Sequence, residues 1–233
     1  MSQFTATNEA DTESPFETED RAVDRALTAF GRGKPIMIHD GSEREGETDL
    51  IYPAHSVDVP AVSRLRNDAG GLICVALGDS VAEAFDLPFL QEVIDHPLTD
   101  NHELTYDTRS SFSLTVNHRK THTGITDRER SMTIRAVATA ASEPERVDFA
   151  TTFRAPGHVH LLRAAPGLLD DRQGHTEYAI AVAQETGLPA AVTVCEMLDD
   201  ESGLALSVAA AKAYSTQNDI PFVEGRWLRR RLD

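Results

Sequence analysis

The sequence has very few cysteines and no long apolar run. Its two cysteines, Cys74 and Cys195, each lie within an apolar stretch of the 233 residues. Buried free thiols are therefore favoured over a disulfide, and a reducing cytosol is the predicted location. No apolar run approaches the length of a membrane span, and the chain starts with polar and acidic residues, without the pattern of a secretory signal. We expect no membrane partner.

Positive charge is scarce as well. The chain has 22 basic against 38 acidic residues, a net charge of -16, and its lysines are Lys34, Lys120 and Lys212. Because nucleic acids are bound by basic faces, we expect no nucleic-acid partner. An acidic surface poor in lysine is typical of proteins kept soluble in high salt, where screening removes self-repulsion. A halophilic origin is our hypothesis. A melting temperature that does not rise between low and molar salt would contradict it.

Common signatures of nucleotide and hydrolase sites are also missing. The sequence has no glycine-rich phosphate loop followed by Lys-Ser or Lys-Thr, and no paired-glycine fingerprint of dinucleotide binding. It has no Gly-x-Ser-x-Gly elbow of a serine hydrolase. The sequence therefore gives no support to these classes.

The composition is that of a globular protein, 40% hydrophobic and 26% charged. Apolar runs predict strands at residues 36–39, 50–52, 72–77, 112–116, 158–162, 191–194 and 220–223. Periodicity and capping residues predict a helix from Ser14 or Thr18 to Gly31, and others at 59–66, 81–85, 126–141, 176–186 and 207–217. Strands and helices mix without strict alternation. The predicted fold class is α+β (mixed α/β): a single domain with a mixed, twisted β-sheet covered by helices in three layers.

The expected organisation has three parts. Residues 1–13 have the composition of a disordered leader, residues 14–225 form one catalytic domain, and residues 226–233 form a basic, solvated tail. Residues 86–110 are polar and show no clear period, which predicts a long loop. Long loops in compact domains are often functional.

An acidic stretch follows the first predicted strand. Glu45, Glu47 and Asp49 alternate with small residues, so an extended backbone would place the three carboxylates on one face, with Arg44 on the other side or bent over the top. That crowding is unfavourable unless a cation or a substrate hydroxyl binds there. Mg²⁺ or Mn²⁺, which take oxygen ligands, would relieve it. The alternative, which this stretch alone favours, is a solvated acidic loop.

A second polar stretch lies at the start of a predicted helix. Free backbone N–H groups at a helix N-terminus attract anions, Gly174 allows close approach, Thr176 offers a hydroxyl, and Arg172 offers a donor fork suited to phosphate. His175 and Glu177 add a possible metal ligand and a possible acid or base. The alternative is a capped helix with a surface arginine.

Three further residues are candidates on weaker grounds. His158 at a strand entrance could carry protons near neutral pH, although such a histidine is more often structural. Glu196 ends a buried strand, where a site role and a surface role are nearly balanced. Cys74 on physical grounds alone is a packed core thiol, with a place at the wall of a site as the alternative.

Together these segments resemble the 3,4-dihydroxy-2-butanone 4-phosphate synthase family, from about Phe16 to about Val223. The resemblance rests on residues 40–54, Thr123-Gly-Ile-Thr126 followed by Arg130 and Thr133, residues 153–159, residues 172–177, and Cys195-Glu196. It implies a lyase that converts D-ribulose 5-phosphate to L-3,4-dihydroxy-2-butanone 4-phosphate and formate in riboflavin biosynthesis. It also implies Mg²⁺ or Mn²⁺, one or two ions per site, and a homodimer with sites near the subunit interface.

The resemblance also implies roles for individual residues. Metal ligands would be Glu45 and His175. Substrate contacts would be Arg44, Glu45, Asp49, Arg172, Gln173, Gly174, His175, Thr176 and Glu196. Catalytic groups would be Asp40, Glu47, Cys74, His158, Glu177 and Glu196, with Cys74 lining the site rather than packing in the core.

The chemistry of the substrate agrees with such a site. Ribulose 5-phosphate has a ketone next to hydroxyl-bearing carbons, and removing the adjacent proton gives an enediolate that a metal stabilises. The later steps need several acids and bases held close together. Two alternatives remain open: a metal-dependent phosphosugar isomerase, which releases no formate, and a non-catalytic acidic binding protein, in which Glu45→Gln or His175→Ala changes no activity.

Overall fold

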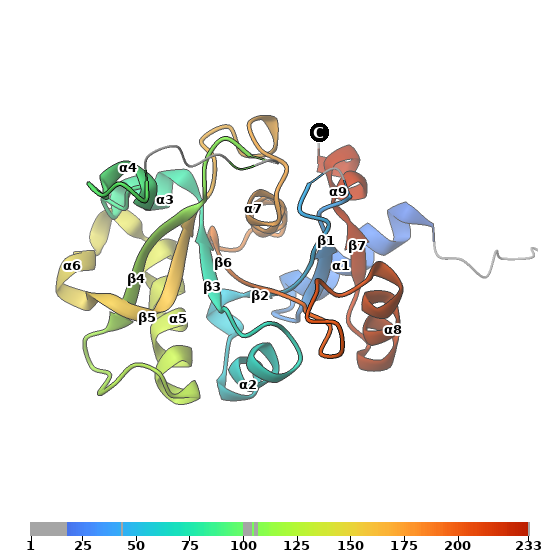
Figure 1. The fold of residues 1–233 in the computed structure, drawn as a ribbon, viewed down its shortest axis with the longest axis horizontal. Helices are drawn as coiled ribbons and strands as arrows, with labels where there is room; N and C mark the ends of the chain where they lie inside the picture. The colour runs from blue at the N-terminus through green and yellow to red at the C-terminus, as the bar shows by residue number, and fades with distance from the viewer. Residues whose placement is uncertain (1–17, 43, 100–103, 105–106, 233) are drawn as a thin grey trace, which may run out of the picture.

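The chain forms one mixed β-sheet in three layers (Figure 1). The structure is a computed structural model that describes residues 18–42, 44–99, 104 and 107–232. Within these residues the sheet has seven strands in the order β4-β5-β3-β6-β2-β1-β7. The strands are β1 (Ile36–His39), β2 (Thr48–Pro53), β3 (Cys74–Leu77), β4 (Phe112–His118), β5 (Phe153–Arg163), β6 (Ala191–Glu196) and β7 (Phe222–Glu224). The predicted fold class is confirmed.

Strand β6 occupies the centre of the sheet. It pairs antiparallel with β2 on one side and with β3 on the other, and β3–β5 and β1–β7 are parallel pairs. Apolar side chains alternate between the two faces, because successive residues of a strand point in opposite directions. Val75 contributes to one core, and its neighbours Cys74 and Ala76 contribute to the other. At β3, both faces of the sheet are therefore buried.

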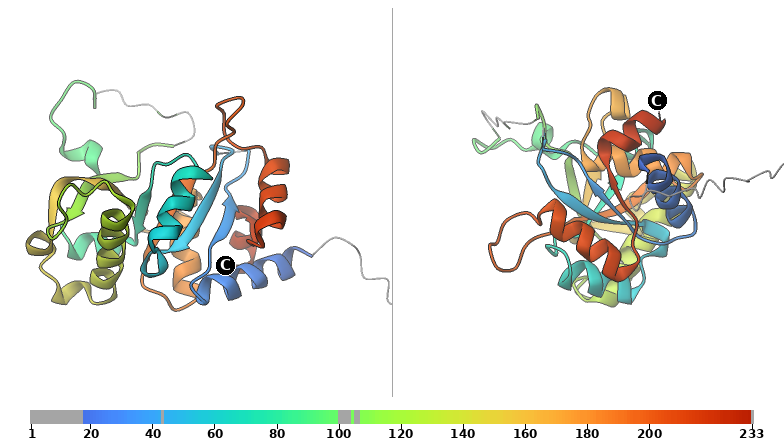
Figure 2. Two further views of the ribbon diagram at one scale, coloured as in Figure 1. Left: turned by 90° about the horizontal axis from the view of Figure 1, so that it is seen from below. Right: turned by 90° about the vertical axis from the view of Figure 1, so that its right-hand side faces the viewer.

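Helices cover the two faces in separate groups. The first group contains α2 (Val59–Asn67), α3 (Asp79–Ala84), α5 (Asp127–Ser142) and α8 (Val208–Asn218), and the second contains α1 (Glu19–Gly31), α7 (His175–Glu185) and α9 (Gly225–Leu232). The right-hand view of Figure 2 shows α8 and α5 on one side of the sheet and α1 with α9 on the other. The short helices α4 (Leu90–Val93) and α6 (Phe149–Thr152) lie near β4 and β5. Within the described part of the chain, no helix is both long and apolar enough to cross a lipid bilayer.

The two ends of the described chain pack together. The prediction of a solvated tail at 226–233 is wrong for residues 226–232, because they continue α9, and Leu228 is fully buried. Arginines of α9 form ion pairs with α1, between Arg230 and Glu19 and between Arg231 and Asp24. At the other end Thr18 caps α1, one of the two predicted starts. The predicted leader, and the alternative start at Ser14, lie outside the described residues.

Strand β5 begins five residues before the predicted strand at 158–162. Its additional residues pair only with β4, and the register between the two strands shifts between Val116 and Asn117. Pro156 lies in this irregular part, where no second neighbouring strand needs its missing N–H. The predicted loop at 86–110 contains the single turn of α4, and residues 100–103 and 105–106 of it lie outside the described chain.

Candidate active site

Four chain segments meet where helix α7 begins. Asp49 on β2 is paired with Glu196 on β6, and Cys74 on β3 is paired with Val194, two residues before Glu196. Residues two apart on a strand share a face, so all three polar side chains lie on the face that α7 covers. The loop between β1 and β2 closes the group from the side. The sheet and the N-terminus of α7 therefore hold these functional groups on regular structure.

The acidic loop does not have the extended form predicted for it. Only Asp49 of the three alternating acids belongs to β2, and Gly46 has φ +72°, which turns the chain before the strand. Asp40 stabilises this turn, because its two carboxylate oxygens accept the backbone N–H groups of Glu45 (3.3 Å) and Glu47 (3.1 Å). The three carboxylates consequently point to different places and are not an equivalent triad.

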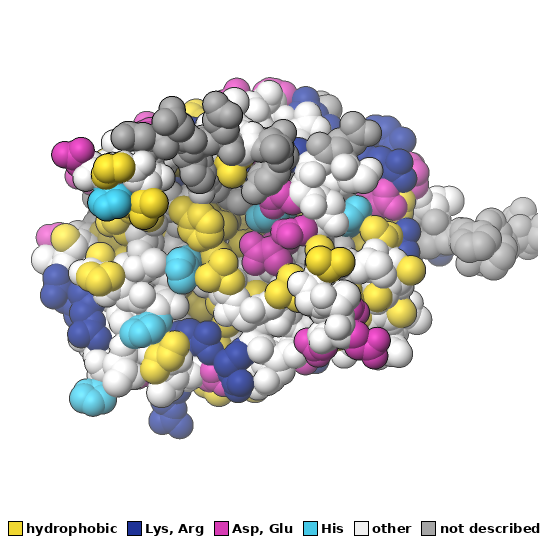
Figure 3. All heavy atoms as spheres, in the orientation of Figure 1, with side chains coloured by type: hydrophobic (Ala, Val, Ile, Leu, Met, Phe, Trp, Pro, Cys, Tyr) yellow, Lys and Arg dark blue, Asp and Glu magenta, His cyan; other side chains and the backbone are white. Residues whose placement is uncertain are grey.

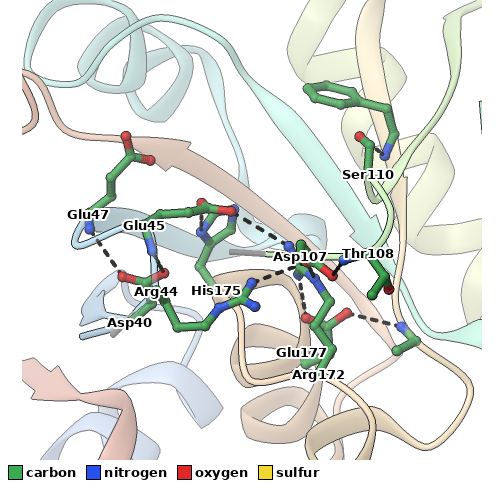
Figure 4. A network of polar contacts seen from close by, with 12 residues as sticks. Asp40, Arg44, Glu45, Glu47, Asp107, Thr108, Ser110, Arg172, His175 and Glu177 are labelled. Atoms are coloured by element: carbon green, nitrogen blue, oxygen red, sulfur yellow. Dashed lines mark hydrogen bonds and ion pairs between the residues drawn. The ribbon is translucent and has the colours of Figure 1, made fainter. Parts of the chain in front are cut away.

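The turn brings Glu45 to His175 at the start of α7 (Figure 4). Nδ1 of His175 lies 3.3 Å from a carboxylate oxygen of Glu45 and 3.7 Å from one of Asp49. Among the residues that the structure describes, two overlapping sets of three side chains have ligand atoms within 4.8 Å of one another: Asp40, Glu45 and His175, and Asp49, His175 and Glu196. Both sets share His175.

A cavity of about 370 Å³ opens beside this cluster. Seven residues with predicted site roles line it: Glu45, Glu47, Cys74, Arg172, His175, Thr176 and Glu196. Leu72 and Phe112 line it as well and remain 40% and 37% exposed. Figure 3 shows acidic, hydrophobic and histidine side chains gathered near the middle of this face. A larger cavity of about 900 Å³ between α1, α2 and the end of α8 contains none of the predicted residues, so volume alone does not identify the site.

Burial makes negative charge costly in the cluster. It raises the pKa of Glu45 to about 7 and the pKa of Asp49 well above its usual range, and the Glu196 carboxylate raises the pKa of Asp49 further. The pKa of His175 is lowered to about 3, first by burial and then by Arg172. The imidazole is therefore neutral at pH 7 and offers a lone pair.

Buried polar atoms of the cluster lack hydrogen-bond partners among the described residues. Asp49 is completely buried, and neither of its carboxylate oxygens has a hydrogen-bond partner among the described residues; the same holds for Nδ1 of His175. Unpaired buried polar groups are rare in folded proteins and call for an explanation. A neutral imidazole among carboxylates is a ligand set that a divalent cation fits. The residues present therefore match a metal site.

Arg172 lies at the centre of the polar network in Figure 4. Its Nη1 donates to Glu177 (2.6 Å), its Nη2 lies 3.7 Å from Glu45, and its Nε donates to Asp107. Arg44 also donates to Asp107, at 3.3 Å. Asp107 is a site residue that the sequence did not identify. It comes from the predicted loop at 86–110, and no local pattern marks it.

The N-terminus of α7 has open donors beside Arg172. Gly174 precedes the helix without a side-chain cap, and the buried hydroxyl of Thr176 has no partner among the described residues. A Cβ at position 174 would lie 2.4 Å from Nη1 of Arg172, so a larger residue there would displace the guanidinium from its present position. Helix N-termini of this kind bind anions.

Seven predicted residues do not line this cavity: Asp40, Arg44, Asp49, His158, Gln173, Gly174 and Glu177. His158 is exposed on β5, and Gln173 is exposed beside a neighbouring cavity that Asp40 and Arg44 also line. Glu177 is fully buried behind Arg172 and accepts the backbone N–H of Ala165 at 3.0 Å. The geometry of Glu177 favours holding Arg172 in place over the predicted proton transfer.

Cys74 lies at the cavity wall, as the resemblance implied, and is almost completely buried. Burial, and after it the charge of Glu196, raises the pKa of its thiol well above the usual range. The thiol is therefore protonated at neutral pH and is a poor nucleophile.

Comparison with known proteins gives a consistent result. The family model described as 3,4-dihydroxy-2-butanone 4-phosphate synthase matches residues 24–230. The synthase of Methanosarcina mazei is 46% identical over 217 residues, which cover 88% of this chain and 88% of the relative. The synthase of Archaeoglobus fulgidus is 45% identical, over 87% of this chain and 90% of its own length.

Solved structures share the fold. The synthase of Candida albicans has a TM-score of 0.75 and 28% identity, over 91% of this chain and 97% of the other. A synthase solved in complex with two magnesium ions has a TM-score of 0.70 and 24% identity, over 88% of this chain and 94% of the other. At 24% identity, the similarity to the magnesium-bound synthase shows a common fold and nothing more.

Proposed function

Because the chain belongs to the 3,4-dihydroxy-2-butanone 4-phosphate synthase family, we propose that it converts D-ribulose 5-phosphate to L-3,4-dihydroxy-2-butanone 4-phosphate and formate. The observation that carries the proposal is the junction of two unlike sites. A cluster of buried, unsatisfied acids around His175 adjoins a helix N-terminus that carries Arg172. The first suits a cation and the second a phosphate, so a sugar phosphate that binds a metal fits both.

We propose that Glu45 and His175 hold Mg²⁺ or Mn²⁺, one or two ions per site. Asp40 completes the first set of ligand atoms, and Asp49 with Glu196 completes the second. Such a cation supplies positive charge opposite the oxygens of an enediolate, which lowers the cost of forming it. His175 contributes by staying neutral, because its lowered pKa leaves the lone pair available at pH 7.

Arg172, the backbone N–H groups at the start of α7 and the Thr176 hydroxyl are proposed to bind the substrate phosphate. Glu177 orients Arg172 from behind, through the bond at 2.6 Å. Binding the phosphate at one end of the cavity directs the carbon atoms towards the acids at the other, which converts binding energy into orientation.

Glu47 and Glu196 are proposed to transfer protons to and from the substrate. Both line the cavity, and burial raises the pKa of each above its usual range. A raised pKa improves a carboxyl group as an acid near neutral pH and keeps it available as a base. Leu72 and Phe112 line the cavity wall and are proposed to limit the access of water.

We also propose that two copies form a homodimer through the uncovered face of β4 and β5. Leu162 is the one β5 side chain in the core beneath α1, α7 and α9, and no described β4 residue belongs to that core. The face therefore remains uncovered, with His158 and Phe112 exposed on it. A second copy there would shield the cavity and enclose His158. Sedimentation of the wild type and of Phe112→Glu tests this; a monomeric wild type would contradict it.

A cytoplasmic location is also proposed, because it fits the two buried free thiols.

The decisive experiment incubates the protein with ribulose 5-phosphate and Mg²⁺, with and without chelator, and measures formate and the four-carbon phosphate. We expect formate that depends on metal and is lost in Glu45→Gln. The matched control is Glu201→Gln, an exposed acid in a turn outside the site. Consumption of substrate without formate indicates an isomerase, and no consumption with any metal indicates a binding protein.

A further inference from the structure

Asn117 of β4 connects two segments that the sequence analysis singled out. Its side chain is buried, 3% exposed. The side-chain oxygen accepts the backbone N–H of His158 (2.9 Å), and the side-chain nitrogen donates to the carbonyl of Thr123 (3.2 Å). The same nitrogen lies 3.1 Å from Nδ1 of His158. One amide therefore contacts both the backbone and the ring of His158.

The two backbone contacts fix the orientation of the amide. A backbone N–H only donates and a carbonyl only accepts, so exchanging the oxygen and nitrogen of Asn117 would make both contacts repulsive. The second N–H of the amide consequently faces Nδ1 of His158. Because that N–H is a donor, Nδ1 must be the acceptor, and the proton of the neutral ring resides on Nε2.

The surrounding structure is built around this amide. Asn117 lies where the β4–β5 register shifts, and its amide replaces the missing backbone partner of His158. Gly124 has φ +91°, and a Cβ there would lie 2.1 Å from the Asn117 side chain. Glu129 holds the same loop by accepting the backbone N–H of Gly124 (2.9 Å) and the hydroxyl of Thr123 (3.0 Å). The loop is thus shaped to leave room for the amide.

We propose that Asn117 is a positioning residue that fixes the ring and tautomer of His158, so that Nε2–H is presented as a hydrogen-bond donor to a substrate oxygen. For the contact between His158 and the substrate, the inference rests on the proposed function and on the proposed homodimer, which encloses this residue. For the tautomer it rests on the contacts of Asn117 alone. In this proposal the neutral His158 ring donates a hydrogen bond through Nε2–H. It does not act as a base that accepts a proton at Nε2.

The first test is the ring spectrum of His158 in the intact protein. Long-range ¹H–¹⁵N correlation distinguishes the two tautomers, and the His158→Gln variant identifies the signal. We expect the proton on Nε2 in the wild type. Asn117→Asp keeps the shape but offers an oxygen to Nδ1, so the proton should move to Nδ1. A wild-type His158 ring that carries its proton on Nδ1 overturns the inference. So does an Asn117→Asp variant in which the proton of His158 stays on Nε2.

The second test is kinetic. The outer partners of metal-ligating histidines typically contribute 10- to 100-fold to activity. By analogy, kcat for formate release should fall by roughly that factor in Asn117→Asp. In a His158→Gln background the same change should cost almost nothing, because the two residues act as a unit. If Asn117→Asp lowers kcat by the same factor in the His158→Gln background, Asn117 has a purely structural role and the inference is refuted.

A control variant separates local from general damage. Asn67→Asp alters an exposed amide on α2 that bonds to Ser63, and it should change neither the ring spectrum nor kcat. If the wild type makes no formate, the proposed function fails, while the ring spectrum still decides the tautomer.

Discussion

Replacing Asp49 by asparagine is expected to stabilise the metal-free protein. Asp49 is completely buried in β2 without a hydrogen-bond partner for either carboxylate oxygen among the described residues. Burial, followed by the charges of Glu196 and Glu47, raises its pKa well above the usual range. Without a cation the folded protein must hold this charge at a cost or take up a proton. Asparagine has the same shape and no charge, so the cost disappears.

The size of the effect follows from the burial. A buried polar group without a partner costs about 1–3 kcal/mol by mutational measures. The asparagine amide is itself unpaired there, so we expect a gain of about 1–2 kcal/mol in the free energy of unfolding. For a chain of this size, 1 kcal/mol shifts the melting temperature by about 2–4 °C. The expected rise is therefore about 2–8 °C.

Calorimetry at pH 8 in chelator measures this directly, with the exposed substitution Asp200→Asn as the matched control. Mg²⁺ should then raise the melting temperature of the wild type more than that of Asp49→Asn, because an ion that binds the folded state alone stabilises it. Formate release should fall in the variant. A lower melting temperature of Asp49→Asn in chelator, or an equal response to Mg²⁺, would refute the reasoning.

Three further predictions concern pH, phosphate and salt. In chelator, the free energy of unfolding should fall as pH rises from 5 to 8. The pKa of Glu45 is raised from 4.5 to about 7 in the folded state, so the folded state binds this proton more tightly than the unfolded chain. This stabilisation is complete below pH 4.5 and is lost as pH rises through 7. The loss is about 3 kcal/mol, and Glu45→Gln should flatten the curve of melting temperature against pH; a wild-type curve that is flat or rising contradicts this. Asp107→Asn should bind inorganic phosphate about tenfold more tightly by calorimetry, because it removes a carboxylate that competes for Arg172 and Arg44; weaker binding would mean that Asp107 orients the arginines. The melting temperature of the wild type should rise between low and molar salt, because screening relieves a net charge of -16, and no rise would contradict the halophilic hypothesis.

Local signals predicted most of the helices and strands. The capping box at Thr126 located the start of α5, and the apolar run at Ala191 located β6, the central strand. These features succeed because capping and burial on both faces leave a pattern within a few residues. The tail was mispredicted because the helical turns around Leu228 are too few to show a period, and the contacts that hold α9 come from α1.

The structure brings together seven of the residues predicted for the site around one cavity, but the sequence did not show their geometry. Glu45 and His175 are 130 residues apart, and only the resemblance joined them before the structure did. The turn at Gly46 depends on bonds to Asp40, which alternation of charge does not reveal. Asp107 meets Arg172 across 65 residues, with no motif to mark it. Long-range contacts of this kind are set by the sheet order and not by nearby sequence.

The central place of β6 also bears on how the protein is made. Strands β2 and β3 leave the ribosome early, yet each pairs with β6, which ends at Glu196, and β1 waits for β7 near the end of the chain. A nascent chain therefore exposes open strand edges until most of it has been synthesised. Strands so distant in sequence pair slowly during folding. Ribosome pausing before residue 191 should thus promote aggregation, and chaperones that shield strand edges should raise the yield of folded protein.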